Sequence, residues 1–120
     1  MKEENRNTEK LYDLSELREM SDNNQDFINR MIYMFIQNSE KTIDEFNTLV
    51  PQEKWTEIGE AAHKILPSYR HLQVNHIVDL LTQIKEKTLI DSDYNEIPLL
   101  VDSTIEKIEK LIPELKREMN

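Results

Sequence analysis

Apolar residues recur every three or four positions along most of the chain, which is the spacing that places side chains on one face of a helix. The first ten residues lack this pattern, and we expect residues 1–10 to form a flexible tail and residues 11–120 to form one domain. A short helix is predicted near Ser15 to Met20, and a long helix follows it and ends before Pro51. One continuous long helix is favoured over two helices with a bend. Its apolar positions are Phe27, Ile28, Met31, Ile32, Phe35, Ile43 and Phe46.

The spacing of apolar residues predicts three further helices after the long one. From Gln52 to about Leu72 the apolar residues step by three and four, so they form one stripe that should face the core. A break at residues 73–75 separates this helix from the next, which the apolar residues between Ile77 and Ile84 predict. The polar residues 91–93 predict a loop before the last helix. The stripe of the third helix contains Trp55, Ile58, Ala62, Ile65, Tyr69 and Leu72.

The last helix is predicted from Ile97 to Leu115. Pro98 fits its first turn, where the missing amide hydrogen would have no helical partner, and Pro113 is expected to bend or fray its end. The chain contains one glycine and four prolines, too few for many tight turns between strands. We predict an all-α fold, namely an up-down-up-down antiparallel four-helix bundle with a short additional N-terminal helix.

Charge and composition narrow the classes of partner. The net charge of -9 repels the phosphates of nucleic acids and anionic membrane surfaces, so neither is expected as a partner. The absence of cysteine excludes a disulfide, a thiol nucleophile and a thiolate metal site. The first ten residues lack the apolar core of a secretory signal, and the longest apolar run is far below the ~20 residues that span a bilayer. We expect a cytoplasmic protein.

The third predicted helix carries the candidate chemistry at His63. His63 follows Ala62 of the core stripe and is rotated from it by about 100°, so its side chain should face solvent. Gly59, the sole glycine, lies four residues earlier inside the helix, where it costs roughly 1 kcal/mol relative to alanine. Because Gly59 has no side chain, we expect it to leave room beside His63 for a reactive group of another protein. Pro67 removes the amide partner of the His63 carbonyl, and Lys64 and Arg70 are expected to supply positive charge.

A solvent-exposed imidazole is largely uncharged near neutral pH and offers a ring-nitrogen lone pair for attack on phosphorus. Nearby cations would stabilise the charge on the transferred oxygens. From the residues alone, however, a single exposed histidine on a helix is more often an ordinary surface residue than a nucleophile.

The segment Ala62-His63-Lys64-Ile65, followed by Pro67-Ser68 and by Leu72, resembles the motif of the histidine-phosphotransfer (HPt) family. The chain from about Leu11 to Met119 also fits the helix order of that family. The resemblance implies that His63 accepts a phosphoryl group from a receiver-domain aspartate and relays it to another in a two-component phosphorelay.

The same resemblance implies the partners, which are a response-regulator receiver domain, a hybrid sensor histidine kinase, or both. The chain would be a phosphoryl carrier, not an independent enzyme. We expect a monomer, and the wide apolar edge of the long helix leaves a dimer as the alternative. It would need no cofactor of its own, because the magnesium ion belongs to the receiver.

The sequence departs from the family motif at three positions. Leu66 and Pro67 stand where the family usually has lysine and glycine, and Gln73 stands where a later glycine is common. A degenerate bundle that binds receivers without transferring phosphate, as an adaptor or sequestering protein, is therefore an alternative function.

Other chemistry finds less support. Glu60 and His63 have the Glu-x-x-His spacing of a di-iron bundle site, but that site needs a second such motif, and neither His71 nor His76 provides one. We therefore predict no metal site, and expect His71 and His76 to be ordinary surface or boundary residues.

A second apolar edge lies beside the core stripe of the long helix. Phe27, Met31 and Met34 widen its apolar face. These residues either complete the core or form a docking patch, where flexible methionines suit a partner helix.

Overall fold

The computed structural model describes residues 11–90 and 94–119, and these residues form helices connected by short turns, without strands. The all-α bundle predicted from the apolar pattern is confirmed. The expectations of a flexible tail at residues 1–10 and of a loop at residues 91–93 fall outside the described residues. The elements are α2 (Ser15–Met20), α3 (Gln25–Leu49), α4 (Trp55–His71), α5 (Asn75–Leu89), the 3-10 turn η1 (Tyr94–Glu96) and α6 (Ile97–Arg117).

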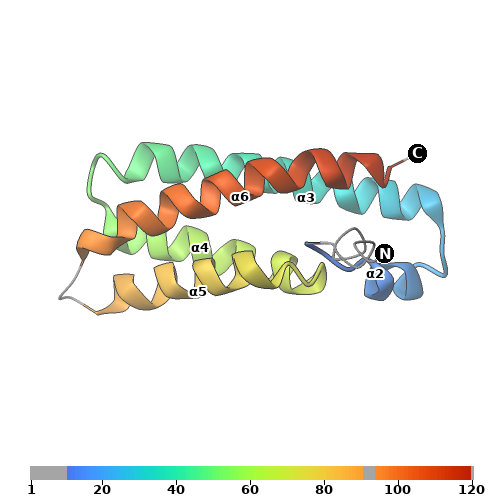
Figure 1. The fold of residues 1–120 in the computed structure, drawn as a ribbon, viewed down its shortest axis with the longest axis horizontal. Coiled ribbons are helices and arrows are strands. Elements are labelled where there is room, and N and C mark those ends of the chain that lie inside the picture. Colours follow the sequence, from blue (N-terminus) through green and yellow to red (C-terminus); the bar gives the residue numbers. More distant parts are fainter. Residues whose placement is uncertain (1–10, 91–93, 120) are drawn as a thin grey trace, which may run out of the picture.

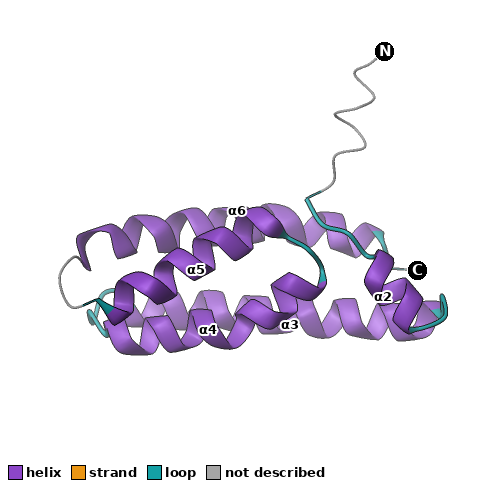
Figure 2. Ribbon diagram, turned by 90° about the horizontal axis from the view of Figure 1, so that it is seen from below, coloured by secondary structure: helices purple, strands orange, loops and turns teal. Residues whose placement is uncertain are grey.

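The four long helices form a closed ring of neighbours. Each packs against the next along the chain, and α6 returns to pack against α3. Figure 1 shows α3 and α6 in one layer and α4 and α5 in the other, and Figure 2 shows the same bundle from a second direction. The short helix α2 lies at the end of the bundle where α3 begins and α6 ends. Successive antiparallel helices with short turns are the arrangement that the short connections predict.

The core is built from one face of each helix, as the stripes predict. Ile28, Ile58, Ile77 and Ile108 are fully buried, one on each long helix. None of the described helices combines the length and the apolar character needed to cross a bilayer.

The long helix α3 is continuous, and Ser39 in its polar middle takes part in the core. Ser39 is fully buried and its hydroxyl forms a 2.7 Å hydrogen bond with the hydroxyl of Tyr69 on α4. The Tyr69 ring also packs on Phe35, with ring centroids 4.6 Å apart. Burial raises the pKa of the Tyr69 hydroxyl above its ordinary value. Trp55, which was expected on the core stripe, is only half-buried and stacks on Tyr94.

Among the described α-helices, only α3 has a side-chain cap at its start. The side chain of Asn24 accepts a hydrogen bond from the backbone N–H of Phe27 and caps the start of α3. Helix α4 begins at Trp55, later than the predicted Gln52, because residues 51–53 form a turn in which Glu53 has a φ of 54°. The last helix continues past Pro113 to Arg117, since the exposed face of the helix tolerates the missing amide hydrogen there.

The segment before and within α2 forms hydrogen bonds with the adjacent end of the bundle. The backbone N–H of Asp13 donates to the carbonyl of Leu72 at 2.8 Å. The Tyr12 hydroxyl donates to one carboxylate oxygen of Glu118 at 2.6 Å, and Arg18 reaches the other at 3.3 Å. These contacts join the beginning of the described chain to the end of α6 and position α2 beside α4.

Candidate functional site

His63 lies near the middle of α4 with its side chain exposed, next to the fully buried Ala62. The position agrees with the rotation of about 100° between successive residues of a helix. Among the described residues, no hydrogen bond or ion pair holds the imidazole. Both ring nitrogens therefore remain available to a partner.

Gly59 does not lie on the open surface beside His63, as the sequence had suggested. It is buried, and a Cβ atom built on it would lie 2.9 Å from Cβ of Thr88 on α5 and still closer to the Thr88 hydroxyl. The missing side chain therefore makes room for α5, not for an outside partner. The expectation that Gly59 gives access to His63 is wrong in this respect, because a helix wheel gives the angle of a residue but not the neighbour it faces. A lone glycine inside a helix is nevertheless the signal of such a close approach.

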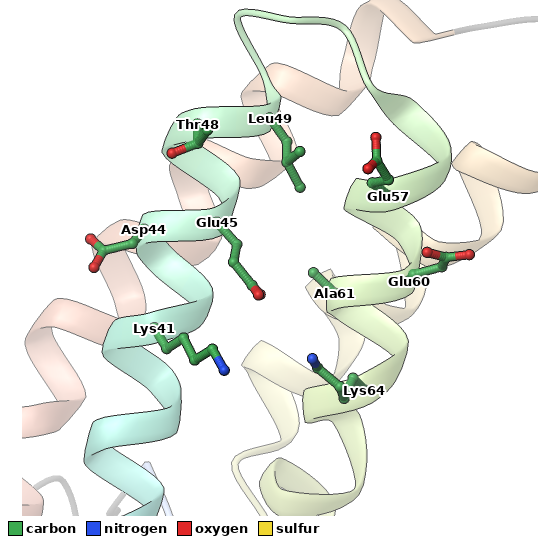
Figure 3. A pocket seen from close by; sticks show the side chains of 9 residues that line it. All are labelled: Lys41, Asp44, Glu45, Thr48, Leu49, Glu57, Glu60, Ala61 and Lys64. Carbon is green, nitrogen blue, oxygen red and sulfur yellow. The ribbon is translucent and has the colours of Figure 1, made fainter.

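The two candidate cations lie differently around α4. Lys64 is exposed about 100° around the helix from His63, on the side that faces α3. Figure 3 shows its ammonium group directed toward the space between α3 and α4. Arg70 is exposed on the same flank of α4 as His63, but about 10 Å further along the helix axis. The structure therefore does not place Lys64 beside His63.

Leu66 and Pro67 occupy the positions where the resembling family has lysine and glycine. Leu66 is 1% exposed and belongs to the core. Pro67 is exposed, and α4 runs through it as one helix to His71. No cation can reach solvent from position 66 unless the packing around it changes.

A groove runs along the seam between α3 and α4, on the opposite flank of α4 from His63. Three adjoining hollows form it and share lining residues, among them Asn38, Lys64 and Ser68. At the α2 end the lining is mostly apolar and includes Met31 and Met34, which are 36% and 54% exposed. The third residue of the expected docking patch, Phe27, packs against the core and does not line this hollow.

The middle and far end of the groove are charged. Figure 3 shows the ends of Lys41, Glu45 and Lys64 directed into the space between the helices. Neither lysine forms an ion pair among the described residues. Glu57 and Glu60 line the α4 side of the same hollow, but no group of acidic or histidine side chains in the described chain has the arrangement of a metal site.

The other two histidines lie apart from His63. His71 is exposed, and its Nδ1 atom lies 3.4 Å from a carboxylate oxygen of Glu16, which links α4 to α2. His76 on α5 is half-buried. Burial lowers the pKa of the His76 imidazole, Lys107 lowers it further, and Asp79 partly opposes both effects.

The fold defines the class of this protein as an all-α, up-and-down four-helix bundle with a short N-terminal helix. Comparisons with protein-family models, curated proteins and solved structures found no match.

Proposed function

We propose that this chain is a histidine-containing phosphotransfer protein and that His63 is its phosphoryl acceptor. The observation that carries the proposal is the exposed imidazole of His63, without a partner in the described chain, on the second long helix of an antiparallel bundle. The resemblance of the segment around His63 to the HPt motif supports the same residue. The expected partners are a receiver domain and a hybrid sensor histidine kinase.

The transfer step follows from the chemistry of imidazole. A ring-nitrogen lone pair of His63 attacks the phosphorus of an aspartyl phosphate on the receiver. The N–P bond forms while the P–O bond to the aspartate breaks, and the carboxylate leaves with the electron pair. Transfer to a second receiver reverses these bonds. Magnesium on the receiver would neutralise the phosphoryl oxygens, so the bundle itself needs no cofactor.

The exposed position of His63 on a helix surface leaves room for a partner to supply further catalytic groups. The outer face of α4 carries Glu60 and Pro67 near His63, both exposed. Docking of a receiver over this face would exclude water and bring its acidic site to the imidazole. The bundle then acts as a support that fixes the position and orientation of the His63 imidazole.

A binding-only adaptor is the second candidate function. The observation that favours it is the burial of Leu66, because the cation that the HPt motif carries at this position is replaced by a core side chain. An adaptor would bind receivers over the same surface without accepting phosphate.

Transfer from phosphorylated receiver domains separates the two functions. Wild type, His63→Gln and His71→Gln are each mixed with a panel of phosphorylated receivers, and the protein-bound label is tested for stability in acid and in alkali. The relay predicts an acid-labile, alkali-stable label on wild type and on His71→Gln, and none on His63→Gln. Receiver binding without label on wild type would leave the adaptor as the function.

A further inference from the structure

The contact between Gly59 and Thr88 fixes the register of α4 against α5. The Gly59 backbone approaches Thr88 so closely that a Cβ atom would collide with it, so these two residues lie at one level of the bundle. The helices are antiparallel neighbours, and four residues forward along α4 therefore correspond to about four residues backward along α5. Measured along the helix axes, His63 lies about 6 Å from the level of Gly59 and Thr88, and Lys85 lies about 4.5 Å from it in the same direction.

Lys85 also lies on the correct side of α5. It is rotated by about 60° from Thr88, away from the buried Ile84 and about 40° beyond the buried Leu81, and is half-buried. Lys87 lies on the opposite side of α5, where its ammonium group forms a 3.1 Å ion pair with Glu96 at the start of α6. Because α6 flanks α5 on the Lys87 side, Lys85 belongs to the seam with α4.

His63 lies on the outer side of the same seam. It is rotated by about 40° from the buried Gly59, away from the core stripe of α4. The imidazole and the Lys85 side chain therefore flank one seam at nearly one level. A lysine stem reaches about 6 Å, and it commonly lies along apolar surface with its ammonium in water.

The ammonium group of Lys85 is not used elsewhere in the described chain. Its side chain forms no ion pair or hydrogen bond there, and only its backbone carbonyl is engaged, accepting a 2.8 Å hydrogen bond from the Thr88 hydroxyl. Lys64 faces α3, and position 66 is occupied by a core leucine. Lys85 is thus the cation that lies at nearly the same level of the bundle as His63 and on the same side of the seam between α4 and α5.

We infer that Lys85 of α5 supplies the positive charge that stabilises the phosphoryl group on His63. This inference rests on the proposed function. As the N–P bond forms, the three phosphoryl oxygens retain their negative charge beside the ring, and the Lys85 ammonium donates hydrogen bonds to them. A cation from the neighbouring helix then replaces the lysine that the HPt motif carries on the histidine helix.

The test uses phosphoramidate, which labels histidine without a receiver. The imidazole lone pair attacks phosphorus, the P–N bond to ammonia breaks, and ammonia leaves with the electron pair. Labelling rates at His63 are compared for wild type, Lys85→Met, Lys85→Arg and Lys64→Met. The methionine variants remove one charge each and keep a long apolar stem, so Lys64→Met is a matched control for the change in net charge.

We expect Lys85→Met to label about tenfold more slowly than wild type, whereas Lys85→Arg and Lys64→Met stay within about threefold of it. Equal rates for Lys85→Met and wild type, or a larger loss in Lys64→Met, would overturn the role of Lys85 while leaving His63 as the acceptor. Absence of label at His63 in wild type would instead overturn the proposed function.

A second measurement needs no substitution and holds if Lys85→Met fails to fold. The side-chain NMR signals of Lys85 are followed while wild-type protein is phosphorylated. The Lys85 Cε–Hε signals should shift as the phosphohistidine forms, and those of Lys64 should not. Unchanged Lys85 signals in fully phosphorylated protein would contradict the inference.

Discussion

Gly59 and Thr88 determine how closely α4 and α5 can approach. A Cβ atom at position 59 would lie 2.9 Å from Cβ of Thr88 and closer to its hydroxyl, so the space is already filled. This spacing sets the level of His63 on α4 against Lys85 on α5, and the proposed role of Lys85 depends on it.

Gly59→Ala is expected to destabilise the protein. Overpacking costs about 1–3 kcal/mol, which the better helix propensity of alanine offsets by about 1 kcal/mol. Urea denaturation measures the change in the free energy of unfolding. In a Thr88→Ala background the hydroxyl is gone, and the loss caused by Gly59→Ala should shrink. A gain of about 1 kcal/mol from Gly59→Ala alone, as at an exposed helix position, would show that the two helices are not closely packed here.

The ionisation of Tyr69 makes stability depend on alkaline pH. Burial raises the pKa of its hydroxyl above the ordinary value of 10.0. Above pH 10 the unfolded chain therefore loses this proton while the folded protein keeps it. The contribution of Tyr69 to stability is fully present below pH 10 and falls as the pH rises above it, by up to about 1.4 kcal/mol per pH unit.

Urea denaturation of wild type and Tyr69→Phe between pH 9 and pH 11 measures this contribution. The free energy of unfolding should fall more steeply with pH above 10 in wild type than in the variant. Parallel curves would mean that Tyr69 ionises in the folded protein as it does in water.

At the scale of the helices, the ends depend on left-handed residues that are not glycine. Gln73 has a φ of 55° after the end of α4. The backbone N–H of Gln73 donates to the carbonyl of Arg70, and that of Val74 donates to the carbonyl of Tyr69. This pattern is the Schellman motif, in which the left-handed residue is usually glycine.

Gln73→Gly is expected to stabilise the protein by about 0.5–1 kcal/mol, because glycine adopts positive φ without the steric penalty of a side chain. Thermal unfolding of wild type, Gln73→Gly and the control Gln73→Ala measures this change, and the alanine variant should not gain stability. A glycine variant less stable than wild type would mean that the Gln73 side chain contributes more than its backbone strain costs.

The sequence predicts the helices well and their packing less well, for physical reasons. The apolar period determines which face of each helix is buried, so the four long helices, α2 and the exposure of His63 were all predicted. Helix ends were less accurate, because Glu53 turns the chain without a glycine or proline to signal it. The buried Ser39 was missed, because its hydroxyl finds a partner only when α4 brings Tyr69 to it.

Around the candidate site, too, the sequence predicts the exposed face of a helix better than it predicts which helix lies beside each residue. A helix wheel places Gly59 and Lys64 on either side of His63. It does not show that α5 covers Gly59 or that α3 lies beside Lys64. Lys85 is 22 positions from His63 in the printed sequence and shares no local motif with it. Its relation to His63 depends on the register between α4 and α5, which only the structure supplies.

At the scale of the whole molecule, the bundle has two different flanks along α4. One flank carries His63 and meets α5, and the other carries Lys64 and borders the groove shared with α3. The net charge of -9 repels a phosphate donor, which makes a local cation near the proposed acceptor His63 more important.

The most direct test of this account is the map of phosphorylation on the wild-type protein. After treatment with phosphoramidate, the labelled peptides are identified by mass spectrometry under conditions that preserve phosphohistidine. His71 serves as an internal control, because it is also exposed on α4. The account predicts phosphate on His63 and little on His71. Equal labelling of the two, or labelling of His71 alone, would contradict the assignment of His63 as the acceptor.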